Sequence, residues 1–179
     1  GAAQEPAAKA AKAPAKTPAA VKPVAKEPAK APAKVPVPAD GRPRIDVVFV
    51  LDTTGSMGGL IEGAKAKIWS IANQMISAKP TPRLRIGLVA YRDRGDEYVT
   101  KRFDLSDDID AVYANLQRFT AGGGGDGPES VNQALHEAVT KIGWSADRDV
   151  LKVVFLVGDF PPHRDYRDDV PYPETCREA

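Results

Sequence analysis

The stretch that decides the fold is Ile45-Asp46-Val47-Val48-Phe49-Val50-Leu51, which runs directly into Asp52-Thr53-Thr54-Gly55-Ser56-Met57-Gly58-Gly59. Its first half is rich in β-branched residues and almost entirely apolar, as expected of a central strand that a parallel sheet buries on both faces. Its second half changes at once to glycine and to oxygen-bearing side chains. The sequence therefore predicts a buried strand whose carboxyl end opens into a polar loop.

Segments with strand and helix patterns alternate after this loop. Apolar residues between Leu60 and Ala78 follow helical spacing, and this helix must end before Lys79-Pro80-Thr81-Pro82. Further strands are expected at 84–91, 98–103 and 150–157, and further helices at 108–119 and 128–142. The strand at 98–103 is expected at the sheet edge, whereas 150–157 is expected to be buried. The alternation predicts an α/β fold: a Rossmann-like, mainly parallel sheet with helices on both faces.

Acidic residues follow two of the expected buried strands, at Asp52 and Asp159. Ligands of open parallel sheets bind at the carboxyl ends of the strands, where the strand order reverses. A glycine run at Gly122–Gly125 leads to Asp126 and is expected to close the same rim. The rim is therefore the candidate functional site.

Asp52, Thr54 and Ser56 place one carboxylate and two hydroxyls at alternating positions of the polar loop. Such hard oxygen donors suit Mg²⁺, which takes octahedral oxygen coordination. Hydroxyls add no charge, so a bound cation would stay positive and keep an open position for an outside carboxylate. A carboxylate buried at a strand end is costly without a cation, and Asp159 is a natural second acid. The pattern predicts a divalent-cation site.

At this point the residues resemble a family. The segment Val47–Gly59 resembles the strand and metal loop of von Willebrand factor type A domains, whose pattern is Asp-x-Ser-x-Ser; here it reads Asp52-x-Thr54-x-Ser56. Leu156-Val157-Gly158-Asp159 is similar to the later strand of that family, which ends in its third-loop aspartate. Three further segments resemble the subgroup that includes the alpha-kinase-associated domains: Gly87–Asp93, Gly123–Glu129 and Gly158–His163.

The resemblance implies a metal-ion-dependent adhesion site that holds Mg²⁺, or Ca²⁺ or Mn²⁺, and engages a protein partner. The ligands that carry over from the first and third loops are Asp52, Thr54, Ser56 and Asp159. The family's second-loop ligand is usually threonine, whereas the matching place here is Asp126. Thr120 is the other candidate, although it precedes the glycines. Three carboxylates would leave the site with net negative charge, so it should hold metal firmly and attract an incoming carboxylate less.

The domain is expected to be incomplete. The family normally continues past the third-loop aspartate with another helix and two strands, whereas this chain ends at Ala179. Residues 44–179 are therefore interpreted as a truncated domain, a fragment, or a domain whose sheet a partner completes.

Other polar residues have simpler interpretations. Glu129 is expected to favour the dipole of the helix that begins at Pro128. His163 is expected at the surface rather than in a metal site. Arg94-Gly95-Asp96 spells an integrin-recognition tripeptide, which we interpret as coincidence in a charged turn. A solvated acidic run is expected at Asp165, Asp168 and Asp169.

The charge of the chain is divided unevenly between its two parts. The 179 residues hold 25 Lys and Arg against 24 Asp and Glu. Residues 1–44 carry seven Lys and two Arg against three acids, a net charge of +6, whereas residues 45–179 carry −5. Residues 1–38 consist mainly of Ala, Lys, Pro and Val, with Pro too frequent for a helix. Residues 1–43 are therefore predicted to be a disordered, polyproline-like linker, or a salt-sensitive contact with an anionic polymer.

Composition excludes several classes of protein. One cysteine excludes an intramolecular disulfide framework and a cysteine-based zinc site. The apolar runs are too short for a membrane span. The linker and the absence of an initial Met suggest a protein that is secreted, periplasmic or held in the cell envelope.

Three functions remain open. The first is a non-enzymatic, metal-dependent protein-binding module. The second is a phosphotransferase similar to haloacid dehalogenases, with Asp52 as nucleophile; against it, the second residue after Asp52 is not aspartate and Lys152 lies at the wrong end of its strand. The third is a structural protein that the basic segment tethers to an envelope or to nucleic acid.

Overall fold

The computed structural model describes residues 41–125 and 127–179. The chain divides into two units, Gly1–Ala33 and Lys34–Ala179, and the fold described below belongs to the second. The predicted linker lies almost wholly outside the described residues, as does the candidate ligand Asp126.

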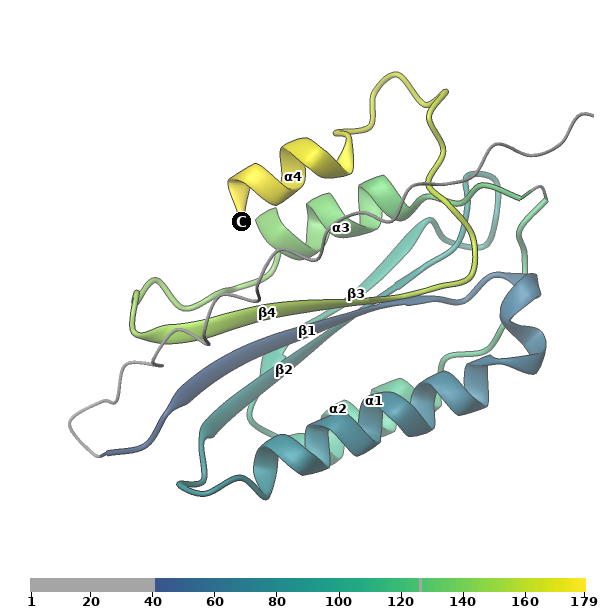
Figure 1. Ribbon diagram of the computed structural model, residues 1–179. Coiled ribbons are helices and arrows are strands. Elements are labelled where there is room, and N and C mark those ends of the chain that lie inside the picture. The colour runs from purple at the N-terminus through teal and green to yellow at the C-terminus, as the bar shows by residue number, and fades with distance from the viewer. Residues whose placement is uncertain (1–40, 126) are drawn as a thin grey trace, which may run out of the picture. The chain divides into compact units, whose positions relative to one another are not determined.

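Four strands form one sheet in the order β3-β2-β1-β4 (Figure 1). Their bounds are β1 Arg44–Asp52, β2 Arg83–Tyr91, β3 Thr100–Ser106 and β4 Val150–Val157. β1 pairs in parallel with both β2 and β4, whereas β3 runs antiparallel to β2 at the edge. The apolar strand is therefore central, and the prediction of a mainly parallel α/β sheet is confirmed.

Helices cover both faces of this sheet (Figure 1). α1 (Ile61–Ile76) and α2 (Ile109–Gln117) lie on one face, and α3 (Val131–Thr140) covers the other with α4 (Tyr172–Glu178) packed on it. A short 3-10 helix, η1 (Gly55–Gly59), follows β1 directly. The polar loop after β1 is thus the start of the crossover that leads through α1 to β2.

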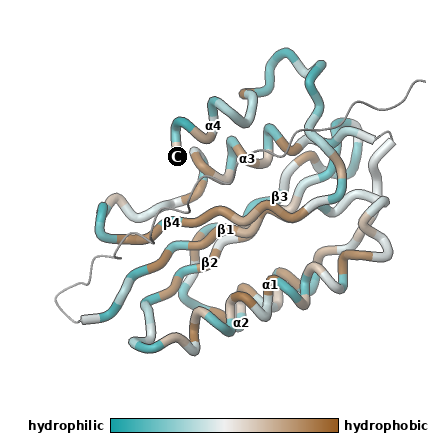
Figure 2. Tube along the Cα trace, in the orientation of Figure 1, coloured by the Kyte–Doolittle hydropathy of each residue, from teal (hydrophilic) through white to brown (hydrophobic). Residues whose placement is uncertain are grey.

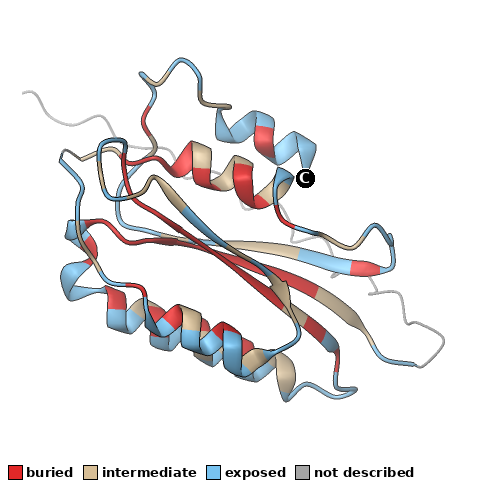
Figure 3. Cartoon of the chain, turned by 180° about the vertical axis from the view of Figure 1, so that it is seen from behind, coloured by how far each residue is buried: buried red, intermediate tan, exposed pale blue. Residues whose placement is uncertain are grey.

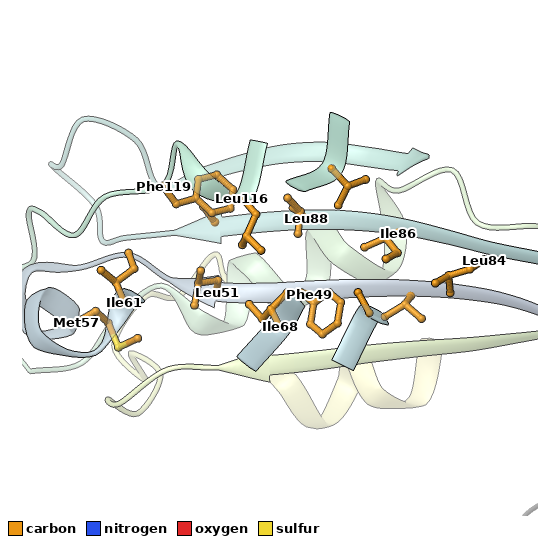
Figure 4. Packing of buried hydrophobic residues seen from close by; sticks show 14 residues of the cluster. Phe49, Leu51, Met57, Ile61, Ile68, Leu84, Ile86, Leu88, Leu116 and Phe119 are labelled. Atoms are coloured by element: carbon orange, nitrogen blue, oxygen red, sulfur yellow. The ribbon is translucent and has the colours of Figure 1, made fainter. Parts of the chain in front are cut away.

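Alternate residues of β1 enter two separate cores, which explains why the strand is apolar almost throughout. Val47, Phe49 and Leu51 belong to the cluster between the sheet and α1 and α2, part of which is shown in Figure 4. Val48 and Val50 belong to the cluster under α3. Full burial of such side chains stabilises a fold by about 1.5–3 kcal/mol each. β1 is therefore held firmly from both sides, and Asp52 at its end is fixed with it.

β4 differs from its prediction as a buried strand. Among the described residues it pairs only with β1, so its other edge has no neighbouring strand. Figure 2 shows β4 as apolar along much of its length, whereas Figure 3 shows much of this strand as intermediate or exposed. Leu151 and Leu156 are 40% and 47% exposed. An apolar run alone does not distinguish a central strand from an apolar edge strand, and the expectation of full burial is wrong here.

α3 begins at Val131 and not at the predicted Pro128. Glu129 forms an extended bridge instead: its N–H donates to the Pro161 carbonyl oxygen at 3.0 Å, and its own carbonyl oxygen accepts from His163 N–H at 3.1 Å. The first turn of the expected helix is therefore used to bind the segment that follows β4. The sequence pattern did not indicate α4, a short helix of 7 residues.

Glu137 lies in α3, and its side chain links this helix to β3 and to Lys141 at the carboxyl end of the helix. Its buried carboxylate accepts hydrogen bonds from Thr100, Arg102 and Lys141. Burial alone would raise its pKa, but these hydrogen bonds outweigh burial and lower the pKa from 4.5 to about 2. Because the pKa is lower in the folded than in the unfolded chain, ionised Glu137 stabilises the fold above about pH 4.5, and this contribution is lost as the pH falls toward 2.

We therefore expect Glu137→Gln to reduce the free energy of unfolding at pH 7 by about 1–2 kcal/mol. Urea denaturation at pH 7 and at pH 2 measures this, with the exposed Glu174→Gln as the matched control. The difference from wild type should become much smaller at pH 2, where Glu137 is protonated in the unfolded chain and about half protonated in the folded one. An equal loss at both pH values would contradict the assigned role.

Candidate metal centre

The candidate site lies where β1 ends. Asp52 is the last residue of β1 and is 0% exposed. β1 connects through α1 to β2 on one side and pairs with β4 on the other, so the strand order reverses beside Asp52. This is the place at which open parallel sheets bind ligands.

Four of the five predicted ligands lie together in one line of polar contacts. Thr54 donates to Asp52 Oδ1 from its backbone N at 2.9 Å and from its Oγ1 at 2.6 Å. Thr54 Oγ1 is 3.1 Å from Ser56 Oγ. Ser56 Oγ in turn donates to Asp159 Oδ1 at 3.1 Å, which joins two loops far apart in sequence. The side chains converge, and their binding of a cation stays a prediction.

The glycine run closes the rim beside this loop, as expected. Gly55 N–H donates to the Gly123 carbonyl oxygen at 2.9 Å, and Gly122 N–H donates to the Thr53 carbonyl oxygen at 3.0 Å. A Cβ on Gly55 would lie 2.7 Å from the Gly123 oxygen, so a residue with a side chain would push the two loops apart. Gly123 also has a φ of +74°, which few other residues adopt.

Thr120, the alternative second-loop candidate, takes part through its backbone. Its side chain is exposed, and its carbonyl oxygen accepts from Arg92 Nη2 at 3.0 Å. The buried Arg92 also donates from Nε to the Thr53 carbonyl oxygen at 3.1 Å. The Arg92 guanidinium therefore joins the main chain at Thr53, after β1, to the main chain at Thr120, before the glycine run. Among the described residues, no contact joins the Thr120 hydroxyl to the candidate site.

Asp52 combines a buried charge with an unused oxygen. Burial raises its pKa above the ordinary 3.8; the hydrogen bonds from Thr54 oppose this increase, and the charge of Asp159 adds to it. Asp52 Oδ2 is buried and forms no hydrogen bond of normal geometry among the described residues, although the Tyr91 hydroxyl interacts with the carboxylate and lowers its pKa slightly. An unpartnered carboxylate oxygen in the interior destabilises a fold. A divalent cation would supply the missing partner, so the residues present fit such an ion.

Gly158 and Tyr91 pack against the Asp52 side chain. A Cβ on Gly158 would overlap Tyr91 Oη and would lie 3.1 Å from Asp52 Oδ2. Burial and the negative charge of Asp52 raise the pKa of Tyr91 far above its usual value, so its hydroxyl stays protonated. The absence of a side chain at Gly158 therefore makes room for the tyrosine beside the carboxylate.

Sequence reasoning missed one acid next to the site, Glu129. It is 1% exposed, and it precedes α3, so the expected role at the dipole of a helix starting at Pro128 is wrong. Burial raises its pKa to about 7, and the negative charges of Asp52 and Asp93 act in the same direction, against a smaller opposing effect of the Thr54 hydroxyl. Its place in the glycine-rich segment was the only sequence signal that could have linked it to the rim.

His163 is buried and not at the surface as expected. It is 5% exposed, with Nε2 3.3 Å from Asp93 Oδ2 and Nδ1 2.8 Å from Asp165 Oδ1. Two other members of the acidic run form ion pairs with Arg94: Asp168 and Asp169. The interpretation of this run as merely solvated is therefore wrong, because it fastens the segment after β4 to the loop after β2.

The integrin-type tripeptide has internal contacts at both ends. Besides the ion pairs of Arg94, Asp96 Oδ2 accepts from Asp93 N–H at 3.0 Å and from Gly124 N–H at 2.8 Å. Gly95 adopts a φ of +94° in the turn between them. The tripeptide therefore shapes the turn beside the glycine run, and its interpretation as coincidence stays a prediction.

No group of three or more His, Cys, Asp or Glu side chains in residues 41–125 and 127–179 is arranged to hold a metal ion. The four side chains of the candidate site differ from such a group, because two of them are acids, Asp52 and Asp159, and the other two, from Thr54 and Ser56, contribute neutral hydroxyls. The candidate centre therefore depends on hydroxyl donors as much as on acids.

One known protein family matches the part of the chain that contains the candidate site. The family model described as von Willebrand factor A domain matches residues 46–161, which span β1, the polar loop, the glycine run and Asp159. The chain belongs to the von Willebrand factor A domain family. Domains of this family are in general protein-interaction modules; they are generally not enzymes and are commonly extracellular.

Two curated proteins are similar to this von Willebrand A domain. The von Willebrand factor A domain-containing protein 7 of Mus musculus is 39% identical over 100 residues, which cover 56% of this chain and 11% of that protein. A putative ariadne-like RING finger protein, R811, of Acanthamoeba polyphaga mimivirus is 28% identical over 127 residues, which cover 69% of this chain and 12% of that protein. The chain thus spans about a tenth of the length of these relatives. In its described part, each helix is too short or too polar to traverse a lipid bilayer.

Proposed function

We propose that this von Willebrand A domain binds a protein partner through a divalent cation held at the rim of the sheet, in the manner of an adhesion module. The side chains proposed as ligands are Asp52, Thr54, Ser56 and Asp159, with Asp126 as a further candidate. The observation that carries the proposal is the 3.1 Å contact between Ser56 Oγ and Asp159 Oδ1. This contact joins an oxygen atom of the first loop to one of the third loop, and Thr54 links Ser56 to Asp52 Oδ1. The other oxygen of Asp52, Oδ2, is buried without a hydrogen-bond partner among the described residues.

The donor set favours Mg²⁺, with Ca²⁺ and Mn²⁺ as alternatives. When bound, the cation would supply a positive charge that attracts an oxygen atom of the partner. Asp52 and Thr54 are buried and would anchor it from the protein side, whereas Ser56 and Asp159 are exposed. The open side of the site therefore faces solvent, where a partner can approach.

The remaining parts of the assignment are proposals of the same kind. We propose that residues 1–43 serve as a linker, with a salt-dependent contact to an anionic polymer as the alternative. We also propose a location outside the cytoplasm, secreted or in the cell envelope. Only the rim site is required for the cation-dependent binding.

Replacing Ser56 with alanine should weaken Mg²⁺ binding by about tenfold, because it removes a neutral donor and the hydrogen bond that positions Asp159. Isothermal titration calorimetry with Mg²⁺ measures the affinity. Ser70→Ala, on the exposed side of α1, is the matched control and should bind like wild type. Equal affinities for the two variants would argue against Ser56 as a ligand.

A phosphotransferase would give a different result at the same residue. Treatment with beryllofluoride and Mg²⁺ would then form an adduct on the Asp52 carboxylate, visible by ¹⁹F resonance. We expect none, because Asp52 is fully buried and its Oδ1 already accepts two hydrogen bonds from Thr54. An adduct at Asp52 would overturn the non-enzymatic proposal.

A further inference from the structure

Glu129 is held at the rim by its own backbone. Its N–H and carbonyl oxygen are both bonded to the segment that follows β4, at Pro161 and His163. Its side chain is almost fully buried, so the carboxylate points into the protein and not toward water. A carboxylate in this position needs a partner, and the described residues provide no ion pair for it.

Two buried carboxylate oxygens at the rim lack hydrogen-bond partners among the described residues. Asp52 Oδ2 and Glu129 Oε2 are both inaccessible and form no hydrogen bond among the described residues. They come from different elements, the end of β1 and the bridge before α3. Thr54, which hydrogen-bonds to Asp52, lies against Gly124 together with Glu129, and the charge of Asp52 helps to raise the pKa of Glu129. Two like charges in the interior are costly unless a cation lies between them.

Gly124 makes the approach of Glu129 possible. A Cβ at this position would lie 3.1 Å from Glu129 Oε1 and 3.2 Å from Thr54 Cβ. Both distances are tighter than ordinary van der Waals contact. The glycine therefore leaves space in which Glu129 and the first-loop ligand Thr54 meet.

From these observations we infer that Glu129 contributes its carboxylate to the cation site and takes the second-loop place that Thr120 leaves open. This inference rests on the proposed function, since it concerns the same ion. Asp52, Glu129 and Asp159 do not converge on one point as they stand. Asp159 is exposed, so its side chain can rotate toward the ion when the cation binds.

A consequence concerns the partner. Three carboxylates outweigh the charge of one divalent cation, and the two hydroxyls add none. Such a centre holds its metal firmly but has little attraction for an acidic side chain. The partner group that reaches the ion is therefore expected to be a neutral oxygen, such as an amide or hydroxyl.

The test uses the full chain, Mg²⁺ alone as the probe, and the isosteric variant Glu129→Gln. By titration calorimetry we expect this variant to bind Mg²⁺ at least tenfold more weakly than wild type, roughly the effect of losing a partner of a metal site. Glu174→Gln, an exposed residue of α4, is the matched control and should bind like wild type. Urea denaturation in a chelator gives the second readout: without metal, Glu129→Gln should be as stable as wild type or more so, because it removes a buried charge.

The outcomes separate this inference from the proposed function. Weaker Mg²⁺ binding with unchanged or greater stability in chelator supports Glu129 as a ligand. Wild-type affinity of Glu129→Gln, while Asp52→Asn loses binding, would overturn the inference and leave the proposed site intact. Loss of both affinity and metal-free stability would assign Glu129 a structural role instead. If the wild-type chain bound no Mg²⁺, Ca²⁺ or Mn²⁺, the proposed function itself would fail.

Discussion

Replacing Asp52 with alanine should abolish Mg²⁺ binding, with a loss of affinity of at least about a hundredfold by titration calorimetry. Asp52 is the fully buried acid of the site, and its Oδ1 already orders the Thr54 hydroxyl at 2.6 Å. Removing the carboxylate takes away both a charged ligand and the acceptor that positions a neutral one.

Two controls separate a metal ligand from a residue needed only for folding. Asp52→Asn keeps an acceptor for Thr54 and removes the charge, so it should remain folded by circular dichroism and still lose Mg²⁺ affinity. Asp107→Ala, an exposed aspartate that precedes α2, should bind like wild type. An Asp52→Asn variant that kept wild-type affinity would show that this carboxylate is not a ligand.

A methyl group added at Gly158 should destabilise the fold and the site together. The Cβ of Gly158→Ala would overlap Tyr91 Oη and lie 3.1 Å from both Cβ and Oδ2 of Asp52. Tyr91 is buried, and a close-packed interior offers little room for its ring to move. We expect the free energy of unfolding to fall by about 2–3 kcal/mol in urea denaturation, and Mg²⁺ affinity to fall because Asp52 is displaced.

The cause of this effect can be isolated with a double-mutant cycle. Tyr91→Phe removes the hydroxyl that the new methyl group meets, so it should restore part of the stability of Gly158→Ala. Gly63→Ala in α1 is the matched control, because nothing lies within 4 Å of a Cβ there, and it should be neutral or stabilising. Wild-type stability of Gly158→Ala would contradict the packing described at the rim.

The fold was predictable because its strongest signals are local. The apolar run of β1 favours burial on both faces, and β1 is indeed the strand with a neighbour on each side and a core on each face. Alternation of strand and helix then determines a parallel sheet, whose carboxyl ends share one rim. Asp52 ends β1 and Asp159 follows the neighbouring strand β4, so the link between their loops through Ser56 follows from the topology.

The errors concern features that depend on contacts distant in sequence. β4 is as apolar as a central strand, but its burial is set by how many neighbours it has, which its own residues do not encode. Glu129 was assigned to a helix, whereas pairing with Pro161 and His163 holds it extended and turns its carboxylate inward. His163 itself is buried beside Asp93, which belongs to the loop after β2, so the sequence around the histidine gave no indication of this partner.

The most direct test of the cation site is a crystal structure of the chain grown with Mn²⁺, with anomalous diffraction measured at the manganese edge. We predict one strong anomalous peak at the end of β1, within coordination distance of Asp52, Ser56 and Asp159, about 2.0–2.6 Å for directly bound oxygens. A peak elsewhere, or an ordered rim with no peak at saturating Mn²⁺, would contradict the assignment of these residues as a metal centre.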